Sequence, residues 1–128
     1  MILIVEDHAD TAAALKRLLA KRGHDVTLAE SGEAALALFD EAAAGGAPVP
    51  QVVILDLGLP RMDGVEVLRE LRRREALAGM PVIVYSADFT QQRMRAAQEL
   101  GAREYLVKGA VSWAALTETV ERYLPGAA

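Results

Sequence analysis

Short apolar runs alternate along this chain with longer segments in which apolar residues recur every three or four positions. The runs cover residues 2–5, 26–29, 52–55, 82–85 and 105–107, and they predict five β-strands. The longer segments predict amphipathic helices, one after each strand. Because strands that alternate with helices form βαβ units, the pattern predicts an α/β fold with a parallel sheet rather than a sandwich or a helix bundle.

Capping residues indicate where the expected helices begin and end. Ser31, Thr90 and Ser112 are expected N-caps, because short polar side chains accept hydrogen bonds from the first free amides of a helix. Gly23 and Gly101 are expected just after helix ends, where glycine readily adopts the left-handed conformation. The apolar positions predicted to face the core are, helix by helix, Ala12, Leu15, Leu18 and Leu19; Ala35, Leu38, Phe39 and Ala42; Val65, Leu68 and Leu71; Met94, Ala97 and Leu100; Leu116, Val120 and Leu124.

The handedness of crossover connections restricts the order in which these strands lie. It favours a single doubly wound five-stranded sheet flanked by five helices, with the strands, numbered along the chain, in the order 2-1-3-4-5. The run at 26–29, which is short and contains Thr27, then forms an edge. Such sheets bind ligands outside the carboxyl ends of the strands where the winding direction changes, here between the first and third strands.

Length and composition limit the classes of protein to consider. The 128 residues suffice for one domain, expected to span 1–128 without an effector domain, whether as a whole protein or an excised part. The absence of cysteine excludes a disulfide framework and a thiolate metal site. The apolar start is too short for a signal-peptide core or a membrane span, so we expect a cytoplasmic protein without membrane contact.

The charge distribution argues against a nucleic-acid partner. The net charge is -4 at pH 7, and only 5% of the residues are aromatic. One basic cluster stands out, Arg69 with Arg72, Arg73 and Arg74, and we interpret it as a solvated helix face.

Charged and hydroxyl residues follow the apolar runs at the points where the expected strands end. Glu6 and Asp7 follow the first run and Asp56 follows the third. Ser86 follows the fourth and Lys108 the fifth. Because the carboxyl ends of parallel strands meet at one edge of a sheet, we expect these residues to share one cleft.

The residue types in this cleft indicate metal-assisted phosphoryl transfer. Three carboxylates in one place repel each other and raise the pKa of the group unless a cation compensates. Lys108 supplies one positive charge, and oxygen ligands favour magnesium, with manganese as the alternative. We expect Asp7 and Asp56 to bind the ion directly. Asp56 would then accept a phosphoryl group as an aspartyl phosphate, while Lys108 and the Ser86 hydroxyl contact phosphoryl oxygens.

These residues, together with the segment Leu59-Pro60-Arg61-Met62-Asp63-Gly64, make the chain resemble a response-regulator receiver domain of two-component signalling over essentially its whole length. The resemblance implies a flavodoxin-like fold. It also implies a role for each matching residue: Asp56 as the phospho-acceptor, Glu6 and Asp7 as the acidic pair with Glu6 reaching the metal through water, Gly58 as a ligand through its carbonyl, Ser86 and Tyr105 as the switch residues, and Lys108 as the lysine of the pattern.

The resemblance implies partners as well. A sensor histidine kinase or a phosphotransfer protein would donate the phosphoryl group, and the face of the fourth helix, fifth strand and fifth helix would bind an unknown downstream protein. The chain would catalyse only its own phosphorylation and slow dephosphorylation, and in that sense is not an enzyme. Homodimerisation stays open. Gly109 follows Lys108 where the family usually has proline, so we expect a trans peptide bond there.

Two other functions stay open. An aspartate-nucleophile magnesium phosphatase of the haloacid-dehalogenase type also uses a strand-end aspartate, but it expects a second acid at the position of Gly58. A receiver-like docking domain that acts without phosphorylation would not need the acidic residues or the lysine. His8 and His24 are assigned no role, because an isolated surface histidine is the usual case. Asp63 is expected to cap the third helix, and Trp113 is expected to be half-buried.

Overall fold

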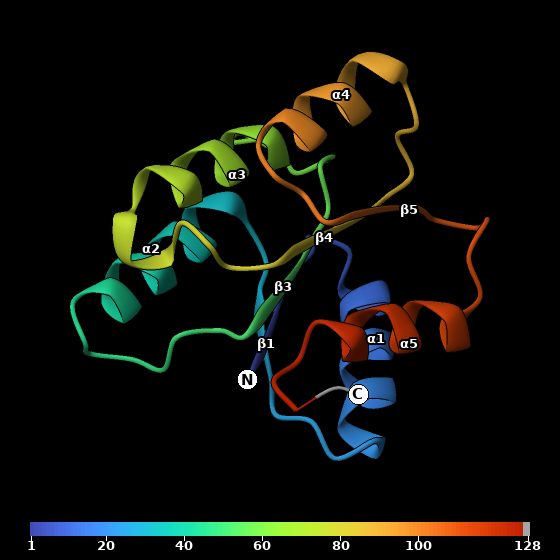
Figure 1. Ribbon diagram of the computed structural model, residues 1–128. Coiled ribbons are helices and arrows are strands. Elements are labelled where there is room, and N and C mark those ends of the chain that lie inside the picture. Colours follow the sequence, from blue (N-terminus) through green and yellow to red (C-terminus); the bar gives the residue numbers. More distant parts are fainter. Residues whose placement is uncertain (127–128) are drawn as a thin grey trace.

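Five parallel strands form the central sheet of the protein (Figure 1). The computed structural model describes residues 1–126, so residues 127–128 of the expected domain lie outside the described range. The strands lie in the order β2-β1-β3-β4-β5, which confirms the predicted fold and the edge position of β2. Their bounds are β1 (Ile2–Val5), β2 (Val26–Ala29), β3 (Val52–Leu55), β4 (Val82–Ser86) and β5 (Glu104–Val107). The last two strands are each one residue longer than predicted.

Helices cover both faces of the sheet. Helices α2, α3 and α4 lie on one face, and α1 and α5 lie on the other (Figure 1). Their bounds are α1 (Ala9–Lys21), α2 (Gly32–Ala43), α3 (Gly64–Arg73), α4 (Gln91–Glu99) and α5 (Trp113–Arg122), with a short 3-10 helix η1 (Glu75–Leu77) that was not predicted.

The two layers of helices explain why the central strands are apolar throughout. In β1, Leu3 and Val5 pack into the core beneath α2, α3 and α4, while Ile2 and Ile4 pack into the core beneath α1 and α5. Successive side chains of a strand point to opposite faces, so a strand covered on both sides needs an apolar residue at every position.

The predicted capping residues and helix-ending glycines are confirmed. Ser31, Thr90 and Ser112 each accept a hydrogen bond from the amide three residues further on. Gly23 and Gly101 follow the ends of α1 and α4 with φ angles of +89° and +81°. A residue with a side chain is strained in that conformation, which accounts for glycine at both positions.

Two predictions for the last two helices are wrong. Met94 of α4 was predicted to face the core but is 37% exposed. Leu124 was predicted to belong to the last helix but lies beyond the end of α5, although it packs against the core as predicted. Trp113 is half-exposed, as predicted, and its ring centroid lies 6.3 Å from that of Tyr85. Helix α4 is therefore a thin cover over β4 and β5, with Ala97 as its one fully buried residue.

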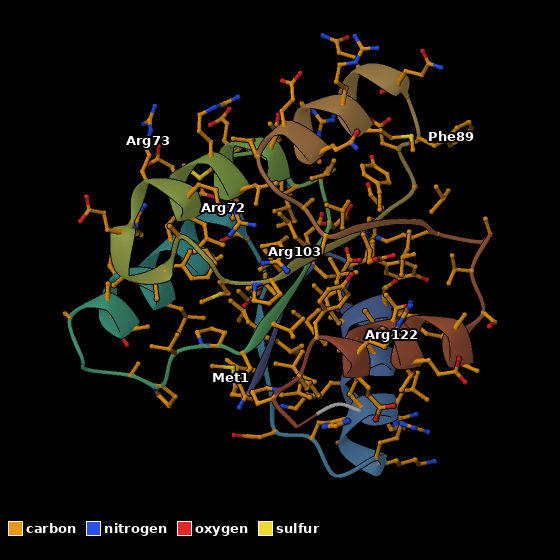
Figure 2. The ribbon with its side chains drawn as sticks, viewed as in Figure 1. Met1, Arg72, Arg73, Phe89, Arg103 and Arg122 are labelled. Atoms are coloured by element: carbon orange, nitrogen blue, oxygen red, sulfur yellow. The ribbon has the colours of Figure 1, made fainter. Side chains whose placement is uncertain are left out.

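The interpretation of the basic cluster as solvated is wrong for two of its members. Arg74 pairs with Asp40 of α2 at 2.8 Å. Arg72 lies under the end of α4, whereas Arg73 points away from the protein (Figure 2). The Arg72 guanidinium donates hydrogen bonds of 2.7 to 3.1 Å to four carbonyls, those of Ala78, Met80, Leu100 and Gly101. Arg72 thereby connects α3 to the end of α4 and to the segment before β4.

None of the helices within residues 1–126 is both long enough and apolar enough to cross a lipid bilayer.

Candidate functional site

Three charged side chains meet beyond the carboxyl ends of β1, β3 and β5. Glu6 and Asp56 directly follow β1 and β3, which pair in parallel with Val5 opposite Leu55. The Nζ atom of Lys108, which directly follows β5, lies 2.6 Å from Glu6 Oε1 and 3.2 Å from Asp56 Oδ2. The sheet therefore brings together the residues that the sequence pattern placed at its strand ends, and one amine serves two carboxylates.

The pKa values of the two buried carboxyl groups shift in opposite directions. Glu6 and Asp56 are 3% and 4% exposed, and ionised carboxylates at such sites are costly unless they are paired. Burial is the dominant influence on Glu6 and raises its pKa in spite of the hydrogen bond from Lys108. Burial also opposes ionisation of Asp56, but the Gly58 amide, which donates to Asp56 Oδ1 at 3.1 Å, and the charge of Lys108 together lower its pKa. The sequence predicted a raised pKa for these carboxyl groups unless a cation compensates. The pKa of Glu6 is raised, mainly by burial, whereas beside Lys108 the pKa of Asp56 is lowered.

Lys108 is kept protonated and is aimed by its surroundings. Burial alone would lower its pKa, but the hydrogen bond to Glu6 and the charge of Asp56 raise it. The Nζ atom lies 5.8 Å from the ring centroid of Tyr85, whose face attracts a cation. The sequence assigned Tyr85 no role in the site. The one indication was its position as the last apolar residue before Ser86.

Glycine in place of proline after Lys108 does not prevent these contacts. The peptide bond between Lys108 and Gly109 is trans, as expected, and residues 1–126 contain no cis peptide bond. Gly109 adopts a φ of +84°, a conformation that glycine reaches without strain. The chain thus turns directly after Lys108 while the amine still reaches both carboxylates.

Asp7 indicates that this group of residues fits a divalent cation. Its Oδ1 atom is buried and, within the described chain, accepts no hydrogen bond. A buried oxygen without a partner is unfavourable and usually marks an unseen ligand or a strained site. Ligand atoms of Glu6, Asp7, His8 and Asp56 all lie within 4.8 Å of one another. Because hard cations bind carboxylate oxygens, the residues present suit magnesium or manganese.

His8, to which the sequence assigned no role, lies against this group. Its Nδ1 atom is 3.2 Å from Glu6 Oε2 and 3.4 Å from Asp7 Oδ1. The available signal was its position directly after the acidic pair. His24, by contrast, lies beyond the other end of the sheet, where it bonds to Glu121 at 2.7 Å.

The two expected switch residues contact the same loop. The buried Ser86 Oγ accepts a hydrogen bond from the Asp88 amide at 3.3 Å, and the Tyr105 hydroxyl donates to the Asp88 carbonyl at 2.6 Å. The Lys108 amide also donates to the Ser86 carbonyl at 2.9 Å. Among residues 1–126, no hydrogen bond joins Ser86 to Asp56, so Ser86 lies next to the site without a hydrogen bond to this carboxylate.

Arg93, which carries no sequence signal, ties the loop after Asp56 to α4. Its guanidinium donates to the Leu57 carbonyl at 2.9 Å and lies 3.3 Å from Asp63 and 3.5 Å from Asp88. The side chain therefore joins the loops that follow β3 and β4. An arginine in the first turn of a helix is ordinary in sequence, and only the fold shows what it reaches.

Gly64 also constrains the loop that follows Asp56. Its amide donates to the Leu57 carbonyl at 2.9 Å. A Cβ atom at this position would overlap the carbonyl oxygen of Asp56 and the Cα atom of Leu57. The glycine therefore allows α3 to begin directly against the backbone that carries Asp56.

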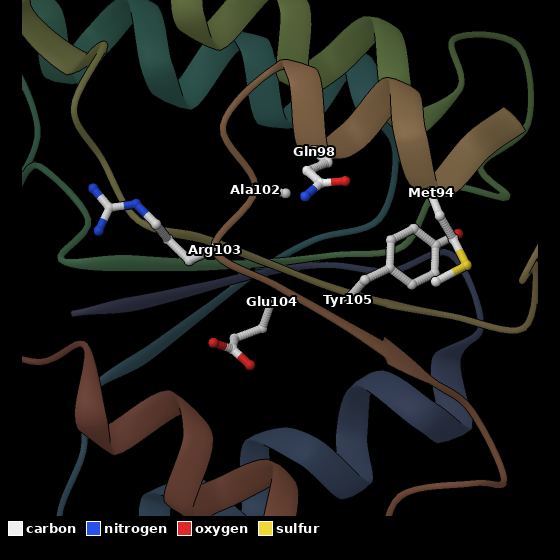
Figure 3. A pocket seen from close by; sticks show the side chains of 6 residues that line it. All are labelled: Met94, Gln98, Ala102, Arg103, Glu104 and Tyr105. Atoms are coloured by element: carbon white, nitrogen blue, oxygen red, sulfur yellow. The ribbon is translucent and has the colours of Figure 1, made fainter. Parts of the chain in front are cut away.

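A separate hollow of about 250 Å³ lies between α4 and β5 (Figure 3). Figure 3 shows the Tyr105 ring beside the Met94 side chain, while Glu104 points away from α4. The residues that line the hollow are Met94, Gln98, Ala102, Arg103, Glu104 and Tyr105. Because Tyr105 bonds to Asp88 and also lines the hollow, a movement of the Asp88 loop would change this surface.

Comparison with known proteins gives consistent matches. The sequence matches the family described as response regulator receiver domain over residues 2–121. It is 40% identical to the sensory transduction protein RegX3 of Mycobacterium tuberculosis over 107 residues, which cover 84% of this chain and 43% of RegX3. It is 37% identical to the sensory/regulatory protein RpfC of Xanthomonas campestris pv. campestris over 114 residues, which cover 87% of this chain and 15% of RpfC. The chain therefore spans less than half of either relative.

Solved structures agree with the sequence matches. The crystal structure of the Mn2+-bound form of response regulator Rcp1 superimposes with a TM-score of 0.84 at 27% sequence identity, covering 99% of this chain and 96% of that chain.

Proposed function

This chain belongs to the response regulator receiver domain family, and from that premise we propose that Asp56 is the residue that accepts the phosphoryl group. The domain is a phospho-acceptor of two-component signalling. The observation that carries the assignment to Asp56 is its ionised carboxylate, which lies beside Lys108 within the acidic cluster. Gly58, two residues later, is exposed and leaves the acceptor open to a donor.

The donor would be the phosphohistidine of a sensor histidine kinase or of a phosphotransfer protein. An Asp56 carboxylate oxygen attacks phosphorus, the phosphorus–nitrogen bond breaks, and the histidine nitrogen keeps the electron pair and takes up a proton. Lys108 stabilises the charge on the phosphoryl oxygens, so the protein contributes mainly position and electrostatics. Attack by water on the acyl phosphate would later return the carboxylate and inorganic phosphate.

The metal ligands would be Asp7 and Asp56 directly, Gly58 through its carbonyl, and Glu6 through water. The unpartnered Asp7 Oδ1 atom supports this set, as does the similarity to Rcp1, which was crystallised with Mn2+. When bound, magnesium or manganese would supply positive charge next to the phosphoryl oxygens.

The switch would run from Ser86 to Tyr105. Phosphorylation adds about two negative charges at Asp56, and the Ser86 hydroxyl would turn from the Asp88 amide towards the new oxygens. Because Tyr105 bonds to the Asp88 carbonyl, the hollow between α4 and β5 would change shape. The exposed Met94 and Trp113 give the face of α4, β5 and α5 apolar area for a downstream protein or a second copy of the chain.

Phosphorylation by acetyl phosphate, followed by intact mass and peptide mapping, tests the assignment. The wild-type chain should gain one phosphoryl group with magnesium and none without it, and Asp56→Asn should gain none. Asp63→Asn is the matched control in the same loop, because asparagine also caps α3 and the variant should be labelled normally. A label on another residue, or full labelling of Asp56→Asn, would refute the proposal.

The same assay separates the two alternatives. A magnesium phosphatase would turn over p-nitrophenyl phosphate continuously, but Gly58 occupies the position where such an enzyme has its second acid. A docking domain that acts without phosphorylation would take up no phosphoryl group at all.

A further inference from the structure

We propose that His8 is a ligand of the divalent-cation site and makes that site bind transition-metal ions such as Ni2+ and Zn2+ more tightly relative to Mg2+. The inference rests on the proposed function, because it concerns the metal ion of the same site. It adds an imidazole nitrogen to ligands that are otherwise all oxygen.

The orientation of His8 is the first observation. His8 is the N-cap residue of α1, but its side chain makes no capping hydrogen bond. Residues at this position usually accept hydrogen bonds from the first turn of the helix. The ring turns instead towards the acidic cluster, and the His8 amide also donates to Glu6 Oε2 at 3.3 Å. The residue is thus held at the acidic cluster by its backbone and its ring, while α1 gains no side-chain cap.

The spacing of the ligand atoms is the second observation. Neighbouring ligands about 2.1 Å from an octahedral ion lie about 3.0 Å apart, and opposite ligands lie about 4.2 Å apart. His8 Nδ1 lies 3.4 Å from Asp7 Oδ1, and that oxygen is the buried atom without a hydrogen-bond partner. With Glu6 and Asp56 included, all four ligand atoms lie within 4.8 Å of one another. The His8 side chain is 67% exposed, so packing does not oppose a small rotation of the ring.

The chemistry of imidazole sets the expected selectivity. Magnesium binds oxygen and keeps several of its waters, so a nearby nitrogen adds little to its affinity. Nickel and zinc bind imidazole strongly, so for these ions the ring would replace a water. The alternative is that a protonated His8 only forms an ion pair with the carboxylates. In that case, loss of the ring would strengthen the binding of every divalent cation, Ni2+ and Zn2+ included.

Isothermal titration of the full chain with Mg2+, Ni2+ and Zn2+ in mildly alkaline buffer tests the proposal. His8→Ala should lose at least about tenfold in Ni2+ and Zn2+ affinity, since loss of even an outer-sphere partner costs about 10- to 100-fold. Its Mg2+ affinity should change less than about twofold, because imidazole contributes little to a magnesium site. His24→Ala is the matched control, because it removes the only other histidine at the far end of the sheet, and it should change neither.

Visible absorption of bound Co2+ gives a second readout that does not depend on affinity. The wild-type and His24→Ala spectra should coincide, and His8→Ala should differ because a nitrogen ligand is replaced by oxygen.

The possible failures are distinguishable. If His8→Ala changes Ni2+ and Mg2+ affinity equally, or changes neither, while Mg2+-dependent labelling of Asp56 persists, the role of His8 is overturned and the proposed function stands. If the wild-type chain binds no divalent ion and Asp56 is not labelled, the proposed function fails and this inference fails with it.

Discussion

At the carboxyl ends of the strands, Glu6 and Asp56 share one amine and, within the described residues, Asp7 Oδ1 accepts no hydrogen bond, whereas at the amino ends Arg72 and Glu121 have several partners each. Arg72 donates to four carbonyls, and Glu121 accepts hydrogen bonds from two cationic or titratable side chains. An excess of like charge is unfavourable until a ligand relieves it. We call the amino edge of the sheet the stabilising end and the carboxyl edge the reactive end, and substitutions that remove a charged group from the two ends should have opposite effects on stability.

The direction of the helices contributes to this difference. In a parallel α/β sheet each helix runs back along its strand, so helix C-termini lie at the amino ends of the strands. The partial negative charge there favours cations, and Arg22 at the end of α1 and Arg72 near the end of α3 fit this pattern. The acidic residues lie at the opposite edge, where α1 begins and its partial charge is positive.

The largest effect should come from the stabilising end. Arg72→Met should lower the free energy of unfolding by about 3 kcal/mol, because hydrogen bonds to a charged donor are lost and several carbonyls are left without partners. Urea denaturation measures the loss, and labelling of Asp56 below the transition should be retained.

The neighbouring Arg73 is the matched control for this variant. It is exposed and, among the described residues, its one ion pair is with Glu70 in the preceding turn of the helix, so Arg73→Met should change stability by less than about 0.5 kcal/mol. Equal effects at the two positions would mean that the contacts of Arg72 do not stabilise the fold.

The second-largest effect on stability should come from a steric change at the reactive end. Gly64→Ala should lower the free energy of unfolding by about 2 kcal/mol, because its Cβ atom would overlap the backbone of Asp56 and Leu57. It should also slow phosphorylation by acetyl phosphate, since relief of the overlap moves the acceptor. Gly79→Ala, where a Cβ atom would meet nothing within 4 Å, should affect neither quantity. Normal labelling of folded Gly64→Ala would show that the acceptor tolerates the shift.

The sequence predicted the parts of this molecule that depend on local pattern. Strand order followed from continuous apolar runs and crossover handedness, and helix ends followed from residues such as Ser31 and Gly23. The convergence of Glu6, Asp56 and Lys108 followed because each directly ends a strand, and the topology brings strand ends together.

The missed features are contacts of flexible side chains between segments distant in sequence. Arg72 and Arg73 are chemically alike, and only their angular position on α3 and the nearby end of α4 make one a partner of four carbonyls. The Arg93 guanidinium likewise reaches the Leu57 carbonyl because the fold brings α4 close to the loop after β3. The spacing of the two histidines gave no signal for His8, whose ligand-like position depends on the carboxylates beside it.

A smaller effect of opposite sign should follow from neutralising the reactive end. Without divalent ions, Asp7→Asn should raise the free energy of unfolding by about 1 kcal/mol, because repulsion within the carboxylate group decreases while Lys108 and solvent already screen part of it. Magnesium should then stabilise the wild-type chain and leave the variant unchanged, since a ligand stabilises only the state that binds it. Thermal melts with and without magnesium measure both effects.

Asp10→Asn is the control for the loss of a negative charge from the same segment. Asp10 lies exposed in the first turn of α1, outside the acidic cluster, so its loss should lower stability by a few tenths of a kcal/mol. A lower stability of metal-free Asp7→Asn would contradict the assignment of excess repulsion to the carboxyl ends.

The smallest effect should be a dependence on pH at the stabilising end. Hydrogen bonds from Arg22 and His24 lower the pKa of Glu121 from 4.5 to about 2. A carboxyl group whose pKa is lower in the folded state stabilises that state above its ordinary pKa and loses the contribution as pH falls. The advantage of wild type over Glu121→Gln in urea should therefore decrease as the pH falls below 4.5 and vanish towards pH 2. This advantage should be small because the Arg22 side chain is 51% exposed and solvent screens the pair.

Glu118→Gln, an exposed position on the same helix, should show no such profile, and a pH-independent difference for Glu121→Gln would mean that packing rather than charge joins α5 to the end of α1.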